Sequence, residues 1–367
     1  MDLSSLQSGA FDCTIVGASF GGLSCAMTLA EAGVPVRILE RKSDAGAKLH
    51  TTGILVRDVI DGVDWLSQLP GALVRRINGV RLYAPDMHAV DLTAPGYYFL
   101  ATDTPQVLRW MAERCRGLGA DLRLGATYSS AQRVEDGFRL DGFGLTKYLV
   151  GADGPKSRVA RDLGLGENRK FLFGIEHEYE GVELAEPDCL HCFIDRRLAP
   201  GYIGWIVNGV GIVQVGLARR ASAPGAAKEA MAAFVEKIAP VVDLRRRAPD
   251  HIRAGLIPCG GLVDPVAAER VLLVGDSAGM VSPVTAGGIH TALEHGQGAG
   301  RAIADFAAGR RDDPSNWFVD SYPRFRAKRG LRWLFDHFQS DLAFNLLLSS
   351  APMRAAARLV FFHRLRA

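Results

Sequence analysis

The chain has 367 residues, of which 48% are hydrophobic and 23% charged, and its formal net charge is +3. This length excludes a single small core and favours two joined domains of an ordinary soluble, globular composition. The small net charge and the lack of a basic stripe with interleaved aromatic residues give no support for a nucleic-acid partner, so we expect none.

The N-terminal stretch MDLSSLQSGAFD has neither the basic start nor the apolar segment of a signal peptide, and no apolar run is long enough to predict a membrane-spanning helix. The six cysteines are scattered along the chain, which indicates a reducing cytoplasm rather than a disulfide framework. The CLHC stretch from Cys189 to Cys192 reads as a strand with its cysteines on opposite faces. We therefore predict no metal or redox site there.

Residues 11–42 predict a strand, a glycine turn, a helix and a second strand. The strand CTIV is followed by GASFGG, then by a helix that ends at Gly33, then by PVRILE. Gly17 permits the tight turn and Gly22 permits close packing of helix on strand, while the helix N-terminus attracts a pyrophosphate. Glu40 stands where an acidic residue accepts hydrogen bonds from the ribose of an adenosine. The unit predicts a dinucleotide site.

One position departs from the usual G-x-G-x-x-G pattern, because Ser19 replaces the middle glycine. A serine with negative φ still lets the backbone approach a ligand, and its hydroxyl offers a phosphate contact. Arg41, which follows Glu40, completes the candidate cofactor-binding residues of this unit.

Two later stretches repeat the strand-to-helix arrangement. In KYLVGADGPKSRVARDLGL a strand ends just before Asp153, and a helix begins near Ser157. In RVLLVGDSAGMVSPVTAGGIHTALEHG, Asp276 closes an apolar strand, and Gly287 and Gly288 precede a helix. From the motif alone, Asp276 could face a ligand or cap the helix that follows.

Together these motifs resemble those of FAD-dependent enzymes of the glutathione-reductase-like group, in the subgroup of aromatic hydroxylases and geranylgeranyl reductases. The resemblance implies that Asp276 accepts a hydrogen bond from the ribityl chain of FAD, and that Gly287 and Gly288 let the backbone approach the flavin ring. The helix dipole there favours negative charge on reduced flavin. The sequence holds one dinucleotide turn, so the resemblance implies that NADPH or another reductant binds only transiently.

Within this subgroup the chain is more similar to the reductases. GDSAGMVSPVTAGGIHTAL resembles their GDAAG.V.P.TG.GI..A pattern, and the YIGW segment from Tyr202 to Trp205 resembles their YxWxFP element. ATDTPQVLRWMAERC resembles VDRxxFDxWLxE, with Thr104 in place of arginine. The largest departure is AKLHTTGIL, where His50 replaces the cysteine of a KPCGG-like stretch.

The resemblance nominates His50, Tyr202 and Trp205 as the catalytic candidates. His50 would donate a proton or orient the substrate. Tyr202 and Trp205 are three positions apart on an expected strand and so face opposite ways, and we expect one of them to line the pocket and the other to join the core.

The reading favoured by these motifs is an FAD-dependent oxidoreductase that reduces a C=C bond of an apolar, isoprenoid-like molecule. One alternative is a monooxygenase or halogenase-like enzyme on a hydrophobic substrate, although no GWxWxIP motif is present. Another is a non-redox flavoprotein of a binding or cyclase type. A cyclase needs a carboxylate pair, for which Glu176 and Glu178 are candidates, but same-face glutamates on a strand are expected to face solvent.

The expected fold class is α/β. We assign residues 1–50, 101–170 and 255–310 to a Rossmann-like FAD domain, and residues 51–100 and 171–254 to an antiparallel-sheet substrate domain with a helix over 226–248. Residues 311–367 form a helical, apolar and basic tail with Trp333, Leu334, Phe335, Phe338, Leu342, Phe344, Arg354, Arg358, Arg364 and Arg366. Such a tail suits an anionic membrane, so we expect a cytoplasmic protein that contacts the inner membrane peripherally, or a packed helical pair. The sequence does not indicate an oligomeric state.

Overall fold

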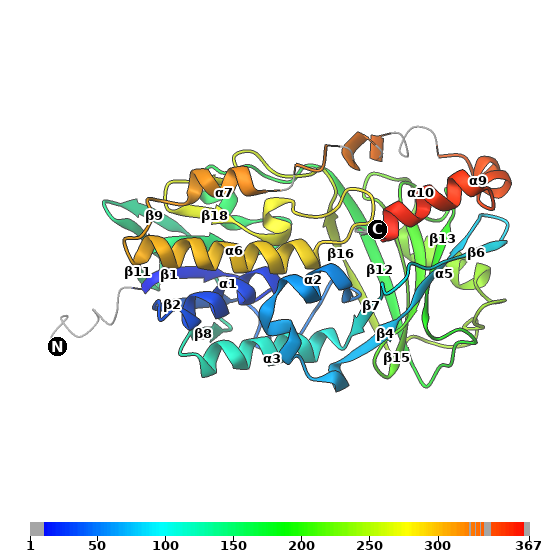
Figure 1. Cartoon of the computed structure of the whole chain (residues 1–367), viewed down its shortest axis with the longest axis horizontal. Coiled ribbons are helices and arrows are strands. Elements are labelled where there is room, and N and C mark those ends of the chain that lie inside the picture. The colour runs from blue at the N-terminus through cyan, green and yellow to red at the C-terminus, as the bar shows by residue number, and fades with distance from the viewer. Residues whose placement is uncertain (1–10, 323, 327, 331, 334–338, 363–367) are drawn as a thin grey trace.

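The computed structural model describes residues 11–322, 324–326, 328–330, 332–333 and 339–362. It places a mainly parallel sheet with its helices at one end of the molecule and an antiparallel sheet at the other (Figure 1). The predicted α/β class is confirmed.

The first sheet is built on parallel pairing of strands from distant parts of the chain. Its strands are β17 (Ala267–Ala268), β18 (Val271–Leu273), β11 (Gly144–Gly151), β1 (Phe11–Val16), β2 (Val36–Glu40) and β8 (Asp121–Leu124) in spatial order, with β9 (Ala131–Val134) and β10 (Gly137–Leu140) beside β11. β1 runs parallel to both β2 and β11, and β11 runs parallel to β18. The turns that follow β1, β11 and β18 therefore meet at one edge of the sheet, where ligands of such folds bind.

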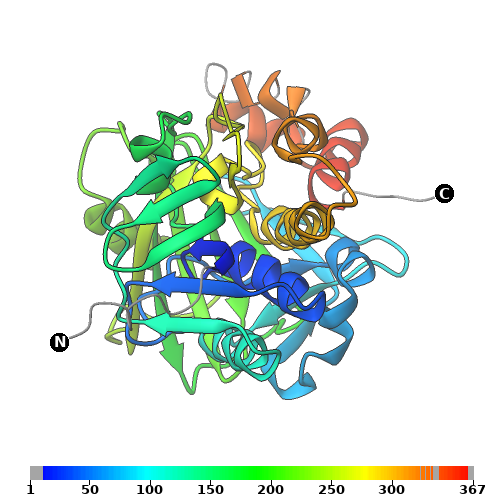
Figure 2. The same ribbon diagram turned by 90° about the vertical axis from the view of Figure 1, so that its left-hand side faces the viewer.

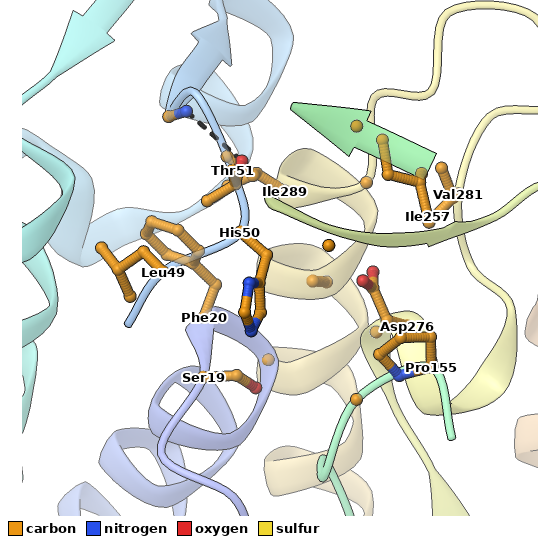
Figure 3. Close-up of a pocket in the computed structure, with 18 of the residues that line it drawn as sticks. Ser19, Phe20, Leu49, His50, Thr51, Pro155, Ile257, Asp276, Val281 and Ile289 are labelled. Atoms are coloured by element: carbon orange, nitrogen blue, oxygen red, sulfur yellow. Dashed lines mark hydrogen bonds between the residues drawn. The ribbon is translucent and has the colours of Figure 1, made fainter. Parts of the chain in front are cut away.

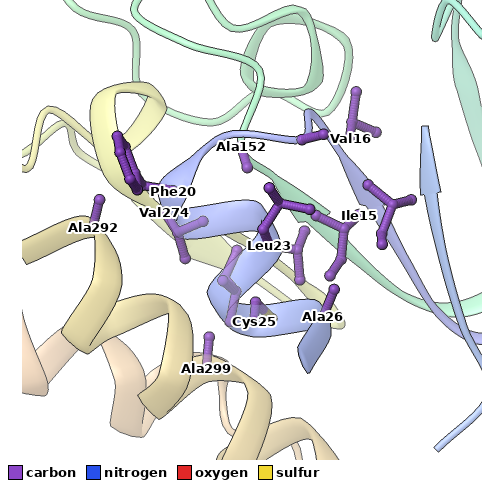
Figure 4. Close-up of a cluster of buried hydrophobic side chains, with 14 of the residues drawn as sticks. Ile15, Val16, Phe20, Leu23, Cys25, Ala26, Ala152, Val274, Ala292 and Ala299 are labelled. Carbon is purple, nitrogen blue, oxygen red and sulfur yellow. The ribbon is translucent and has the colours of Figure 1, made fainter. Parts of the chain in front are cut away.

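Two helices cover one face of this sheet in close contact (Figure 4). They are α1 (Phe20–Glu31) and α6 (Ile289–Ala307). A Cβ at Gly296 would lie 2.4 Å from the Gly21 carbonyl oxygen, and one at Gly300 would lie 2.7 Å from the Cβ of Thr28. Small residues thus let the two backbones approach, and α6 is held with its N-terminus beside the turn after β1. Figure 2 shows the sheet and these helices from their own end of the molecule.

The second sheet forms the other end of the molecule. Its strands are β16 (His251–Pro258), β12 (Phe171–Glu180), β15 (Ile212–Arg220), β14 (Ile203–Asn208), β13 (Cys189–Ile194), β5 (Gly79–Tyr83) and β6 (Ala89–Leu92) in spatial order. On one face Phe234 of helix α5 (Ala227–Lys237) packs among buried side chains such as Phe193 and Val215. On the other face the end of helix α10 (Ala351–Phe361) packs beside Phe99 and Tyr97. The two faces carry separate apolar clusters.

The remaining described elements lie outside the two large sheets. They are the small sheet of β3 (Ile54–Val56), β7 (Phe99–Thr102) and β4 (Val74–Ile77), the helices α2 (Arg57–Gly62), α3 (Thr104–Gly117), α4 (Arg158–Asp162), α7 (Ser315–Ser321) and α9 (Asp341–Leu347), and the short 3-10 turns Asp64–Gln68, Gly71–Leu73 and Gly275–Ala278. The helix expected over 226–248 ends at Lys237, because Pro240 cannot continue it.

The predicted domain segments contribute to the sheets in an interleaved manner. β5 and β6, from 51–100, join strands of 171–254 in the second sheet, whereas β3, β4 and β7 form the small sheet. We propose the division into FAD and substrate domains on this basis. Of the predicted tail, Leu334, Phe335, Phe338, Arg364 and Arg366 lie outside the described residues. Within the described part of the chain, no helix has the length and apolarity needed to cross a membrane.

Candidate active site

A cavity of about 780 Å³ lies where the two sheets meet. Its walls come from the turns after β1, β2, β11 and β18, from the loop 48–53, from β12, β14 and β16, from the N-terminus of α6 and from the end of α10. Its volume is within the range usual for pockets that enclose a small molecule or cofactor. Of the residues that the sequence nominated as catalytic or cofactor-binding candidates, all except Gly22 contribute to its lining.

The turn after β1 requires glycine at the two predicted positions. Gly17 has φ of +107°, and a Cβ there would lie 2.3 Å from the carbonyl oxygen of Ala152. A Cβ at Gly22 would lie 2.1 Å from the Gly17 carbonyl oxygen. Ser19 has φ of −93° and caps α1 by accepting a hydrogen bond from Gly22 N–H, while its hydroxyl donates to Ala152 O at 3.2 Å. The Ser19 hydroxyl is thus engaged within the protein.

Glu40 is buried beneath this turn. Its Oε2 accepts a hydrogen bond from Ala18 N–H at 2.8 Å, and its Oε1 accepts one from Lys42 N–H at 2.9 Å. The carboxylate therefore fixes the turns after β1 and β2 and also lines the cavity. Its contact with a ribose stays a prediction, as does the role of the exposed Arg41 next to it.

The two aspartates nominated from the later motifs differ in how their carboxylates are used. Asp153 accepts hydrogen bonds from the Ser157 hydroxyl at 2.6 Å and from the N–H groups of Arg158 and Val159, so it fixes the start of α4. Asp276 projects into the cavity, and no other described residue donates a hydrogen bond to its carboxylate (Figure 3). Burial raises the pKa of Asp276 to about 6. A half-buried carboxylate to which no other described residue donates suits a hydroxyl of a bound ligand.

Gly288 caps α6 directly beside Asp276. A Cβ at Gly288 would lie 2.9 Å from Cγ2 of Val281 and 3.4 Å from Oδ1 of Asp276. Gly287 and Gly288 thus leave the N-terminus of α6 uncovered toward the cavity, where its N–H groups and dipole favour negative charge.

Comparison with known proteins agrees with this geometry. The FAD binding domain family matches residues 10–334 of the chain. The chain belongs to this FAD-binding family. It is 30% identical over 341 residues to digeranylgeranylglycerophospholipid reductase 2 of Methanopyrus kandleri, with 85% of this chain and 81% of the relative covered. The predicted resemblance to FAD-dependent geranylgeranyl reductases, and with it the class of FAD-dependent oxidoreductase, is confirmed.

Solved structures share the fold at low sequence identity. A geranylgeranyl bacteriochlorophyll reductase-like protein from Thermoplasma acidophilum superposes with a TM-score of 0.78 at 16% identity, covering 96% of this chain and 99% of that one. The myxobacterial chondrochloren halogenase superposes with a TM-score of 0.70 at 16% identity, covering 90% and 82%. At these identities the likeness establishes the fold.

The residues present fit FAD. The glycine turn and the start of α1 leave a space, which a Cβ would fill, that would hold a pyrophosphate, and Asp276 would accept a hydrogen bond from a ribityl hydroxyl. The uncovered N-terminus of α6 would face the flavin ring. These are the same groups that the resemblance nominated.

His50 reaches the cavity from the opposite side to Asp276 (Figure 3). Its Nδ1 lies 2.6 Å from the carbonyl oxygen of Ala254 in β16, and its ring rests over Gly255, where a Cβ would lie 2.7 Å from that of His50. The imidazole is thus oriented by the second sheet. Thr104, in the position of the family's arginine, is fully buried, and its hydroxyl lies 3.0 Å from that of Thr102 beneath the loop rather than in the cavity lining.

Tyr202 and Trp205 both line the cavity, so the expectation that only one would do so is wrong. Tyr202 lies in the turn before β14, where the alternation of a strand does not yet apply. Its hydroxyl donates to the carbonyl oxygen of Thr285, in the loop that precedes Gly287, and burial raises its pKa. Trp205 lies flat against β15, where a Cβ at Gly216 would be 2.4 Å from the indole.

The expectation that Glu176 and Glu178 face solvent is also wrong, because each is only 4% exposed. They lie on the face of β12 that the loop 48–53 covers, and both carboxyls accept hydrogen bonds from residues that are distant in the sequence. Glu176 lines the cavity and Glu178 pairs with Arg253. Sequence reasoning missed this buried polar group. Gln214, a single amide within the apolar run IVQVGL, was the signal for it, since a buried amide requires polar partners.

Proposed function

We propose that this protein reduces a C=C bond of an isoprenoid lipid with FAD as its cofactor. FAD, when bound, supplies a hydride from its reduced ring. The chain itself would bind the cofactor, enclose an apolar substrate, exclude water and deliver a proton.

The two chemically different ends of the cavity carry this proposal. The end near the glycine turn is polar and suits FAD. The other end is lined by apolar side chains that include Phe99, Leu190, Ile203 and Phe361, and the Trp205 indole lies between the two. An isoprenoid chain is recognised by burial of its apolar surface, at about 25 cal/mol per Å². The name of the Methanopyrus kandleri relative specifies a lipid with geranylgeranyl chains, which supports this substrate class.

Within this site we propose three roles for the catalytic candidates. His50, held by Ala254 O, would face the reacting atoms as a proton donor or orienting group. Tyr202 would fix the loop before Gly287 through Thr285, and Trp205 would form the wall against which the alkene lies.

We further propose that α9 and α10 dock on an anionic lipid surface. Leu342, Leu346 and Leu359 are 68%, 71% and 69% exposed, and the exposed side chains of Arg354 and Arg358 lie on the same helical region. Exposed leucines insert into the boundary between headgroups and acyl chains, and arginines pair with anionic headgroups. Since Phe361 at the end of α10 lines the cavity, this surface lies next to the apolar end. The cytoplasmic location belongs to the same proposal.

We propose that the reductant that supplies electrons to the flavin binds to the protein only transiently. The chain has one glycine-rich dinucleotide turn, which FAD would occupy, so NADPH or another reductant would bind briefly beside the flavin. Rapid mixing of the oxidised, FAD-loaded protein with NADPH under nitrogen tests this. Bleaching of the flavin absorbance supports NADPH, and an unchanged spectrum requires another reductant.

Product mass tests the proposed reaction. The FAD-loaded protein is reduced with dithionite under nitrogen and supplied with a geranylgeranyl phospholipid in detergent. We expect a product heavier by two hydrogens for each reduced double bond. A lipid that is unchanged under nitrogen but gains oxygen in air would overturn the proposal in favour of a monooxygenase.

A further inference from the structure

The buried carboxyl of Glu176 forms part of the cavity wall, between the loop 48–53 and the second sheet. Glu176 Oε2 accepts hydrogen bonds from the Thr52 hydroxyl at 2.5 Å and from Trp205 Nε1–H at 2.9 Å. Its Oε1 accepts one from Gln214 Nε2–H at 3.1 Å. Thr52, Glu176 and Trp205 all line the cavity. The carboxyl is therefore shielded from solvent and is one hydroxyl away from the substrate space.

The charges around Glu176 do not balance if both glutamates are ionised. Arg253 forms a salt bridge with Glu178 at 2.5 Å and also donates to Thr51 O at 2.8 Å. Glu176 has no salt bridge with a described residue. Two carboxylates and one guanidinium in a buried cluster leave one negative charge uncompensated, and a proton on Glu176 removes it.

Among the described residues, the other groups packed around Glu176 do not supply a second cation. β14 and β15 contribute the neutral Trp205 and Gln214. From β16, His251 stands opposite Glu178 in the register and is exposed to solvent. From the loop, His50 points its Nδ1 at Ala254 O rather than at the carboxyl. The cluster thus favours one bound proton at Glu176.

Resting on the proposed function, and leaving His50 as the orienting group, we propose that Glu176 carries the proton of the reduction and passes it through the Thr52 hydroxyl to the substrate. The reaction balances with these groups. Reduced flavin would supply the hydride for one alkene carbon and would be oxidised by this transfer. The Thr52 hydroxyl would donate its proton to the other carbon while it takes the proton of Glu176. The π bond is replaced by two C–H bonds, and Glu176 is left as a carboxylate.

The surroundings of Glu176 suit both of its protonation states. Burial raises the pKa of its carboxyl above the ordinary value, while the hydrogen bonds from Thr52 and Trp205 act in the opposite direction. A hydroxyl both accepts and donates, so Thr52 is able to relay a proton. After transfer, the N–H groups of Trp205 and Gln214 stabilise the carboxylate that remains.

Infrared spectroscopy of the FAD-loaded protein tests the protonation without turnover. At neutral pH we expect the wild-type protein to show the carbonyl stretch of a protonated carboxyl, shifted in heavy water and lost in Glu176→Gln. Glu180→Gln, on the exposed end of the same strand, should leave the band in place. A band that persists in Glu176→Gln, or a wild-type protein without it, overturns the proposal.

Single-turnover reduction of a geranylgeranyl lipid tests the transfer. We expect Glu176→Gln and Thr52→Val to slow product formation by roughly 100-fold or more, the usual contribution of a positioned acid. Thr52→Ser, which keeps the hydroxyl, should restore most of the rate. The wild-type rate should also fall as pH rises and Glu176 loses its proton.

The two proposals fail in different ways in this experiment. A wild-type protein that does not reduce the lipid refutes the proposed function. A wild-type protein that reduces the lipid, with Glu176→Gln equally fast over the whole pH range, refutes only the role of Glu176.

Discussion

Substitution of Asp276 by asparagine should stabilise the protein without FAD and weaken its binding of FAD. The half-buried Asp276 carboxylate lines the cavity, and no other described residue donates a hydrogen bond to it. Burial raises its pKa from the ordinary 3.8 to about 6. The folded state therefore binds the proton more tightly than the unfolded state. Proton binding by Asp276 therefore contributes to the stability of the folded protein. This contribution is complete below the pKa that Asp276 has in the unfolded state, and it is lost as the pH rises through the pKa that it has in the folded state.

The magnitude follows from the two pKa values. At pH 7.5 the ionised carboxylate destabilises the folded apoprotein by about 3 kcal/mol, and at pH 5 by about half as much. Asparagine is neutral at every pH, so the apoprotein of Asp276→Asn should be more stable by these amounts. FAD should bind the variant about tenfold more weakly, because a hydrogen bond to a charged acceptor contributes roughly 1.4 kcal/mol more than one to a neutral acceptor.

The assay is urea denaturation of the apoprotein at pH 7.5 and pH 5, followed by tryptophan fluorescence, together with titration by FAD. Asp91→Asn is the matched control, because the hydrogen bond from Arg81 lowers the pKa of Asp91. Its stability effect should have the opposite sign, and it should leave FAD binding unchanged. An Asp276→Asn apoprotein that is less stable than wild type and binds FAD equally well would refute the reasoning and make Asp276 a structural residue.

Three further predictions follow from the cavity and its surroundings. Gly22→Ala places a Cβ 2.1 Å from Gly17 O and should abolish FAD retention, whereas Gly33→Ala, with φ of +73° and no atom within 4 Å, should cost only about 1–2 kcal/mol in urea denaturation and retain FAD. Tyr202→Phe removes the hydrogen bond to Thr285 O and should weaken FAD binding by about 2- to 10-fold in a fluorescence titration. Leu346→Asp should abolish co-sedimentation with anionic vesicles and leave turnover of detergent-dispersed lipid unchanged. Unaltered co-sedimentation would contradict the proposed membrane contact.

The cofactor half of the site was predictable from sequence because its chemistry is local. The turn at Gly17 and Gly22, the acidic end of β2 and the glycines before α6 each lie within a few residues of a strand whose apolar run is easily recognised. The structure confirms the glycine requirements by steric contact. Asp153 was nominated by the same logic, but its carboxylate is occupied by the start of α4, a contact that no motif distinguishes from ligand binding.

The substrate half of the site was less predictable, because contacts between residues far apart in the sequence determine which of its side chains are buried and how they are paired. Glu176 is buried by Thr52, 124 residues away in the sequence, and Glu178 is neutralised by Arg253 on a neighbouring strand. Alternation along a single strand shows which residues share a face but not what covers that face. The expectation that only one of Tyr202 and Trp205 lines the cavity failed for a related reason, because Tyr202 precedes the start of β14 and the alternation of the strand does not determine where its side chain points.

The central claim is that this site reduces an isoprenoid double bond with FAD, and anaerobic reoxidation of the flavin tests it most directly. The FAD-loaded protein is reduced under nitrogen and mixed rapidly with a geranylgeranyl phospholipid or with its fully saturated analogue. We expect the flavin absorbance to return with the unsaturated lipid alone, at a rate that depends on the concentration of that lipid. A flavin that stays reduced with both lipids and reoxidises only when oxygen is admitted would contradict the central claim.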